Sequence, residues 1–153
     1  MVKFTSKQSK GMKVMVVQNN KLEKTCCFYV SEFHLEMILI PYINKKIEEK
    51  ITILTEKNLK ETLNILINKV NLSEDNKQKI LKLGWDGDKE IKENSNIIII
   101  GSKKFIENKN EEIKNKNAVS VLDCYDFEKE KNDINNIVKK YKNSLNTMGI
   151  TSF

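Results

Sequence analysis

The stretch Ile97–Lys104 reads Ile-Ile-Ile-Ile-Gly-Ser-Lys-Lys, and this run decides the fold class. Four consecutive β-branched residues are typical of a strand buried on both faces, and such strands belong to parallel sheets. A weakly helical pattern follows, over Phe105–Lys116. The same unit of an apolar run and then a helical pattern recurs, with further strands predicted at Cys26–Val30, Ile51–Thr55 and Ala118–Leu122.

Strands that alternate with helices predict an α/β fold, here a three-layer α-β-α sandwich around a mostly parallel, Rossmann-like central sheet. The chain has 153 residues, which fits one domain. We expect residues 1–12 to form a flexible lysine-rich arm and residues 13–153 to form the single domain. The apolar run Val14–Val17 is predicted either to pair as a hairpin with the strand after it or to be an edge strand.

Two serines predict where helices begin. Ser31 and Ser73 each precede an acidic residue and a helical pattern, so each is expected to be an N-cap. The first helix is expected to run to about Glu49, with Pro41 kinking or dividing it. A last helix is predicted over Asp133–Thr147, because apolar residues recur there at helical spacing, at Ile134, Ile137, Val138, Tyr141 and Leu145.

The composition excludes several kinds of site. The net charge is +6, and residues 1–24 hold six lysines and one glutamate, so +5 of it lies there and the remainder is near neutral. The chain has no arginine, which excludes bidentate phosphate recognition and an arginine finger in cis. Cys26, Cys27 and Cys124 are expected to be buried free thiols, and with one histidine and no C-x-x-C no metal site is predicted. The absence of an 18-residue apolar run and of a secretory signal predicts a cytoplasmic protein without a membrane partner.

Polar residues at the ends of the predicted strands are the candidate binding residues. In open α/β sheets, ligands bind outside the carboxyl ends of the strands, so segments that follow strands in the same sense should share one edge. The candidates for ligand binding are Thr55, Glu56, Gly101, Ser102, Lys103, Asp123 and Asp126.

Each of these segments has two interpretations. The chain lacks the phosphate-loop pattern G-x-x-x-x-G-K-[ST], and Gly101–Lys103 is either the start of an anion-binding helix or a polar turn. Asp123 follows a predicted strand, as does the acid that holds Mg²⁺ in nucleotide hydrolases, but capping or turn aspartates also occupy this position. His34 is either a general base or a packed or surface histidine. No residue is predicted to be catalytic.

One family resemblance rests on two segments. The segment Cys26–Glu49, with a strand ending Phe28-Tyr29, then Ser31-Glu32 and a helix through Pro41, resembles the opening of the MEDS sensory domains. The segment Val121–Phe127 is similar to a late part of the same family, at Cys124, Tyr125 and Asp126. These domains are relatives of RecA/KaiC-like ATPases that lack the phosphate loop. The resemblance implies a RecA-like three-layer fold and a binding role in signalling, with no catalytic residue.

These observations together predict a non-catalytic regulatory or sensory module, without a cofactor, that acts through a partner protein or a small ligand in bacterial signalling. The first alternative is a nucleotide-binding protein or atypical nucleotide hydrolase that uses Gly101–Lys103 and Asp123. The second is a nucleic-acid-associated protein that uses only the lysine-rich N-terminal arm, which would make binding strongly salt-dependent. Oligomerisation is left open.

Overall fold

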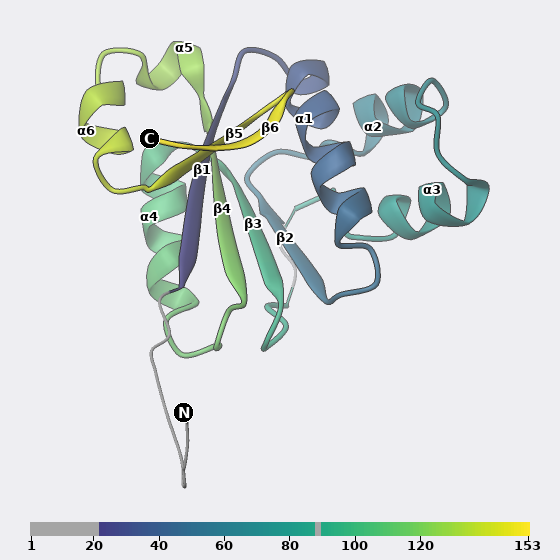
Figure 1. Ribbon diagram of the computed structural model, residues 1–153, viewed down its shortest axis with the longest axis horizontal. Helices are drawn as coiled ribbons and strands as arrows, with labels where there is room; N and C mark the ends of the chain where they lie inside the picture. The colour runs from purple at the N-terminus through teal and green to yellow at the C-terminus, as the bar shows by residue number, and fades with distance from the viewer. Residues whose placement is uncertain (1–21, 88–89) are drawn as a thin grey trace, which may run out of the picture.

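The computed structural model describes residues 22–87 and 90–153 and has an α/β fold built on one six-stranded sheet (Figure 1). The strand order is β2-β3-β4-β1-β5-β6. The first five strands run parallel, and β6 runs antiparallel to β5, so the predicted mostly parallel sheet is confirmed. The strands are β1 (Glu23–Tyr29), β2 (Ile51–Thr55), β3 (Asn96–Gly101), β4 (Ser120–Asp126), β5 (Asn143–Asn146) and β6 (Gly149–Ser152).

Helices pack against both faces of the sheet. The helices are α1 (Glu32–Lys45), α2 (Lys60–Ile67), α3 (Glu74–Leu81), α4 (Lys103–Glu112), α5 (Phe127–Glu130) and α6 (Ile134–Val138). Apolar residues of α1, α2 and α3 share one buried cluster with the sheet, and those of α4 and α6 share a second. Figure 1 shows these two groups of helices on opposite sides of the strands.

The isoleucine run shows why the sheet must be covered on both faces. Ile98 and Ile100 lie in the cluster under α1, α2 and α3, whereas Ile97 and Ile99 lie in the cluster under α4 and α6. Successive side chains of a strand point to opposite faces, so a continuous apolar strand has two buried faces. Burying one such side chain contributes roughly 1.5–3 kcal/mol, which makes β3 a principal contributor to both cores.

The first helix begins as the sequence predicts and ends earlier. The Ser31 hydroxyl accepts from the His34 amide at 3.1 Å, which confirms the N-cap. Pro41 lies inside α1, which continues to Lys45 as one helix rather than two, and the turns after Lys45 are no longer α-helical. Ser73 is likewise confirmed as the N-cap of α3, through the Asn76 amide at 3.1 Å.

The fourth strand lies further along the chain than its apolar run predicts. The predicted strand Ala118–Leu122 ends before Asp123, whereas β4 continues to Asp126. Its residues pair with β1 through Asp126 and with β3 through Tyr125. Asp123 therefore lies inside a central strand, and the expectation that it follows the strand is wrong.

The predicted last helix, Asp133–Thr147, is also wrong. Only α6 is helical there, and the chain then forms the antiparallel pair β5–β6. Asn143, Ser144, Asn146 and Thr147 favour helices weakly, and pairing with β1 provides the competing interaction that their spacing does not reveal. The turn is closed by the Asn146 side chain, whose Oδ1 accepts from the Met148 amide at 2.8 Å.

Some predictions lie outside the described residues. The arm at residues 1–12 and the run Val14–Val17 both belong to the segment before Leu22. Across the described ranges, no helix combines the length and the apolar character that crossing a membrane requires.

Candidate functional site

The carboxyl ends of β2 and β3 meet, as the parallel sheet predicts. The Glu56 amide donates to the Ile100 carbonyl at 2.9 Å, and the Glu56 Oε1 atom accepts from the Ser102 amide at 2.8 Å. Thr55 closes the adjacent turn, because its hydroxyl donates to the Lys57 carbonyl at 2.8 Å and accepts from the Lys57 amide. The structure thus brings Thr55 and Glu56 together with Gly101 and Ser102.

Gly101 permits this close approach of the two segments. A Cβ atom at this position would lie 2.6 Å from Phe105 Cδ2 and 2.8 Å from Glu56 Oε1. Both distances are shorter than van der Waals contact allows, so any larger residue displaces the phenyl ring or the carboxylate. The glycine therefore serves the Glu56–Ser102 hydrogen bond and is not evidence of a phosphate loop.

Lys103 is held by two carboxylates of the segment after β4. Its amide donates to Glu130 Oε2 at 3.2 Å, and its Nζ atom donates to Asp133 Oδ2 at 2.7 Å. This hydrogen bond raises the pKa of the Lys103 ammonium and lowers the pKa of the Asp133 carboxyl. The positive charge at the start of α4 is therefore already paired, which reduces its attraction for an external anion.

Asp126 is the last residue of β4 and is the N-cap of α5. Its Oδ1 atom accepts from the Glu128 amide at 3.0 Å, at the start of α5. The side chain is half-buried and lies at the strand end, unlike Asp123. Asp126 thus stays at the predicted edge and Asp123 does not.

Asp123 lies in a buried polar network beneath α4 and α6. The Tyr141 hydroxyl donates to Asp123 Oδ2 at 2.5 Å, and the Asn110 amide contacts both carboxylate oxygens, at 3.2 and 3.3 Å. The Tyr125 and Tyr141 hydroxyls are 2.6 Å apart. Burial raises the pKa of Asp123, while the two donors and the nearby Lys24 oppose that rise. Asp123 is fully buried, so it is not an exposed metal-binding or ligand-binding group.

The junction of β1 and α1 contains Ser31 and His34, and both side chains bind backbone amides of the turn. His34 Nδ1 accepts from the Val30 amide at 2.9 Å, and Ser31 caps the helix through the His34 amide. His34 is therefore engaged in the local turn, which favours the structural interpretation over the general base. The hydrogen bond is not visible in the sequence, because it depends on the conformation of the turn.

Several backbone amides at the starts of α1, α4 and α5, beside the strand ends, already have acceptors within the chain. At α1 they bind His34 and Ser31, at α4 they bind Glu56 and Glu130, and at α5 they bind Asp126. A helix N-terminus binds phosphate when such amides are free and the dipole meets an anion. Carboxylates of the chain occupy that place at α4 and α5, and the Ser31 hydroxyl occupies it at α1, so an external phosphate would have to displace these groups.

The outer side of α1 bears a row of exposed apolar side chains. Phe33, Met37 and Pro41 recur every four residues, and Val30 precedes them at the end of β1. Met37 is 54% exposed and Val30 is 63% exposed. Met37 and Pro41 also line a cavity of about 330 Å³ against Leu72. We call Val30, Phe33, Met37 and Pro41 the α1 row.

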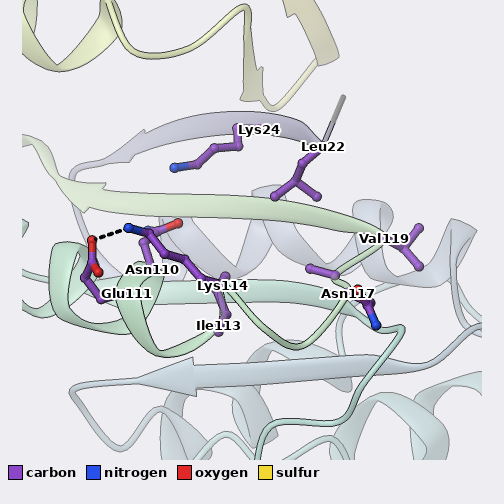
Figure 2. Close-up of a pocket in the computed structure, with 9 residues that line it drawn as sticks. Leu22, Lys24, Asn110, Glu111, Ile113, Lys114, Asn117 and Val119 are labelled. Carbon is purple, nitrogen blue, oxygen red and sulfur yellow. Dashed lines mark ion pairs between the residues drawn. The ribbon is translucent and has the colours of Figure 1, made fainter. Parts of the chain in front are cut away.

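A cavity of about 730 Å³ lies at the other ends of the strands, beside the Asp123 network (Figure 2). Figure 2 shows Lys24 and Leu22 on one side, residues of α4 on a second, and Asn117 and Val119 on a third. Asn110 joins the cavity to Asp123, and the Lys24 ammonium lies 5.7 Å from the Tyr141 ring centre. This cavity combines lysine, amide and apolar groups with the Glu111 carboxylate, which pairs with Lys114 at 2.9 Å.

The cysteines and carboxylates provide no metal centre within residues 22–87 and 90–153. No group of three or more histidine, cysteine, aspartate or glutamate side chains gathers there. Cys26, Cys27 and Cys124 are free and buried, as predicted, and burial raises the pKa of the Cys26 thiol to about 12. The Cys26 thiol is therefore protonated at neutral pH and poorly nucleophilic.

Comparison with known proteins adds no relative to this description: no family model, curated protein or solved structure matches the chain.

Proposed function

We propose that this protein is a non-catalytic regulatory module, a RecA-like three-layer sandwich related to the MEDS sensory domains, that acts by binding a partner protein in signalling. The observation that carries the proposal is the occupation of helix-start amides by the chain's own carboxylates, at Glu56 and Glu130. A module of this kind keeps the geometry of a nucleotide-binding sheet while its anion positions are filled internally.

Electrostatics supports this proposal over nucleotide hydrolysis. Glu32 lies in the first turn of α1, and Glu56, Glu130 and Asp133 surround the start of α4. A nucleoside triphosphate would bring several negative charges close to these carboxylates. Like charges repel, so this proximity would weaken binding of the triphosphate. Lys103 cannot offset this repulsion, since Asp133 already pairs with it.

The α1 row supports a protein as the partner. Contiguous exposed apolar surface on a soluble domain commonly marks an interaction site. Phe33, Met37 and Pro41 are exposed and recur every four residues along α1, and a methionine there adapts readily to a partner's shape. A small ligand in the cavity of Figure 2 would be the alternative occupant of the module.

The first test measures catalysis. Purified protein is incubated with ATP or GTP and Mg²⁺, and phosphate release is followed in the wild type and in Lys103→Ala. We expect no release above the buffer rate in either protein. Turnover by the wild type that disappears in the variant would establish the hydrolase alternative instead.

The second test maps the partner surface. A photo-cross-linking residue replaces Met37, and a control replaces Ile65, which lies on α2 with a similar exposure of 49%. In lysate of the native host, we expect one protein to cross-link through position 37 and not through position 65. Purified, that protein should bind the wild type and lose binding to Met37→Glu. Equal cross-linking at both positions would contradict a partner site on α1.

A further inference from the structure

The strand β6 forms an exposed edge of the sheet. Among the described residues it pairs only with β5, at the end of the sheet (Figure 1), and its residues after Gly149 are exposed. Three apolar side chains of this edge are exposed: Met148 by 92%, Phe153 by 66% and Ile150 by 48%. The opposite edge, β2, differs, because all five of its residues are buried and the Lys92 amide donates to the Thr52 hydroxyl.

The register shows which backbone groups point outward. The Phe153 amide donates to the Lys142 carbonyl at 2.8 Å, so residue 153 forms a hydrogen-bonded pair with residue 142. Such pairs alternate along an antiparallel ladder, which makes Thr151 with Ser144 the next one. The amide and carbonyl groups of Ile150 and Ser152 therefore face away from β5.

Nothing in the sequence of this edge discourages pairing with another strand. Proteins usually protect an exposed edge with lysine, proline or a bulge. Residues 143–153 contain no charged residue and no proline, and they form the longest uncharged stretch of a chain in which 31% of residues are charged. An edge of this composition is suited to accept a strand.

We propose that a second copy of this chain pairs with β6, antiparallel about a two-fold axis at Thr151, so that two sheets become one. In this register Ile150 and Ser152 of each copy face Ser152 and Ile150 of the other, and all four outward-facing residues exchange hydrogen bonds. An antiparallel pair of identical strands satisfies the symmetry that most dimers have.

Side chains in this register also complement one another. Phe153 of one copy lies opposite Gly149 of the other, on the same face of the joined sheet. An aromatic ring placed across from a glycine covers the backbone that the glycine exposes. The self-complementarity of Gly149, Ile150, Ser152 and Phe153 is the reason for naming a second copy rather than an unrelated strand.

The first experiment measures mass in solution. Sedimentation equilibrium of the wild type should give 17.8 kDa at low concentration and rise toward twice that value at high concentration. Ile150→Lys should stay monomeric, because a charge enters the joined strands. Ile65→Lys, at matched exposure on α2, should behave as the wild type. A wild type that remains monomeric throughout would overturn the proposal.

The second experiment tests the register. Residues that face each other in a pair without hydrogen bonds have Cα atoms about 4.5 Å apart, within disulfide range. Thr151→Cys should therefore cross-link two copies on mild oxidation. Ile150→Cys should not cross-link, because residue 150 faces residue 152 of the other copy. The two residues 150 therefore lie diagonally, about 7–8 Å apart. The native cysteines are buried and give no background. Equal cross-linking of both variants, or none, would contradict the two-fold pairing at Thr151.

Discussion

Glu36 is buried between α1 and α2 with one carboxylate oxygen unpaired. Its Oε2 atom accepts from the Thr62 hydroxyl at 2.5 Å, while Oε1 has no partner among the described residues. Burial raises the pKa of Glu36 from 4.5 to about 7. The carboxyl is thus close to half-protonated at neutral pH, and a proton relieves an otherwise unfavourable buried charge.

This carboxyl predicts a pH dependence of stability. The folded state holds the Glu36 proton more tightly than the unfolded state, so the free energy of unfolding should fall as pH rises from about 4.5 to about 7. The full effect is about 3 kcal/mol, at about 1.4 kcal/mol for each pKa unit. Urea unfolding at pH 5 to 8 should show this slope, and Glu36→Gln should lose it and be more stable at pH 8. The exposed variant Glu61→Gln is the control and should keep the slope of the wild type. If Glu36→Gln also keeps that slope, a group other than Glu36 causes the pH dependence.

Gly101 provides a second prediction at the residue scale. Gly101→Ala places a Cβ against Phe105 and the Glu56 carboxylate, so it should destabilise by about 1–3 kcal/mol, as overpacking does. In a Glu56→Ala background one of the two clashes is absent, and the loss should be smaller. Urea unfolding of the wild type, the two single variants and the double variant gives the coupling free energy between positions 56 and 101. Equal losses in both backgrounds would show that Glu56 does not determine the need for glycine.

At the scale of elements, β4 shows how a buried acid is accommodated in a central strand. Asp123 pairs in register with Cys26 and Ile99, and donors on neighbouring elements satisfy its carboxylate. Removal of the acid should therefore be costly, whereas the sequence-based placement at a strand end predicts that Asp123→Ala costs little. Leaving a buried hydrogen-bond donor without its acceptor lowers the free energy of unfolding by roughly 1–3 kcal/mol.

Tyr141→Phe tests this network. The variant keeps the ring and removes the hydroxyl that donates to Asp123, so we expect a loss of about 1–3 kcal/mol in the free energy of unfolding. Tyr125→Phe removes only the contact between the two hydroxyls and should cost less. Thermal unfolding of both variants decides the order, and a larger loss in Tyr125→Phe would contradict the network as described.

The elements also show what the sequence can predict. The limits of β2 match the apolar run Ile51–Thr55, because a strand with two buried faces must be apolar throughout. The meeting of Glu56 with Ser102 follows from the parallel sheet alone. The apolar run alone places Asp123 after the strand, because an acid normally ends such a run, whereas the tertiary donors Asn110 and Tyr141 permit the strand to continue. The apolar spacing of Asp133–Thr147 predicts a helix, whereas pairing with β1 selects a strand at β5.

At the scale of the whole molecule, the fold divides its polar groups between two ends of the sheet. The strand ends carry Glu56, Lys103 and Asp126, all engaged with the chain itself, and the opposite ends carry the cavity beside Lys24. We propose that, among the described residues, these strand ends hold no vacant anion site.

Titration of the ¹⁵N-labelled protein with MgATP, followed by amide NMR, tests that claim most directly. We predict no saturable shift of the Ser102, Lys103 and His34 amides, because carboxylates and side chains of the chain already accept from them. Saturable shifts concentrated on those three amides in the wild type would contradict the account.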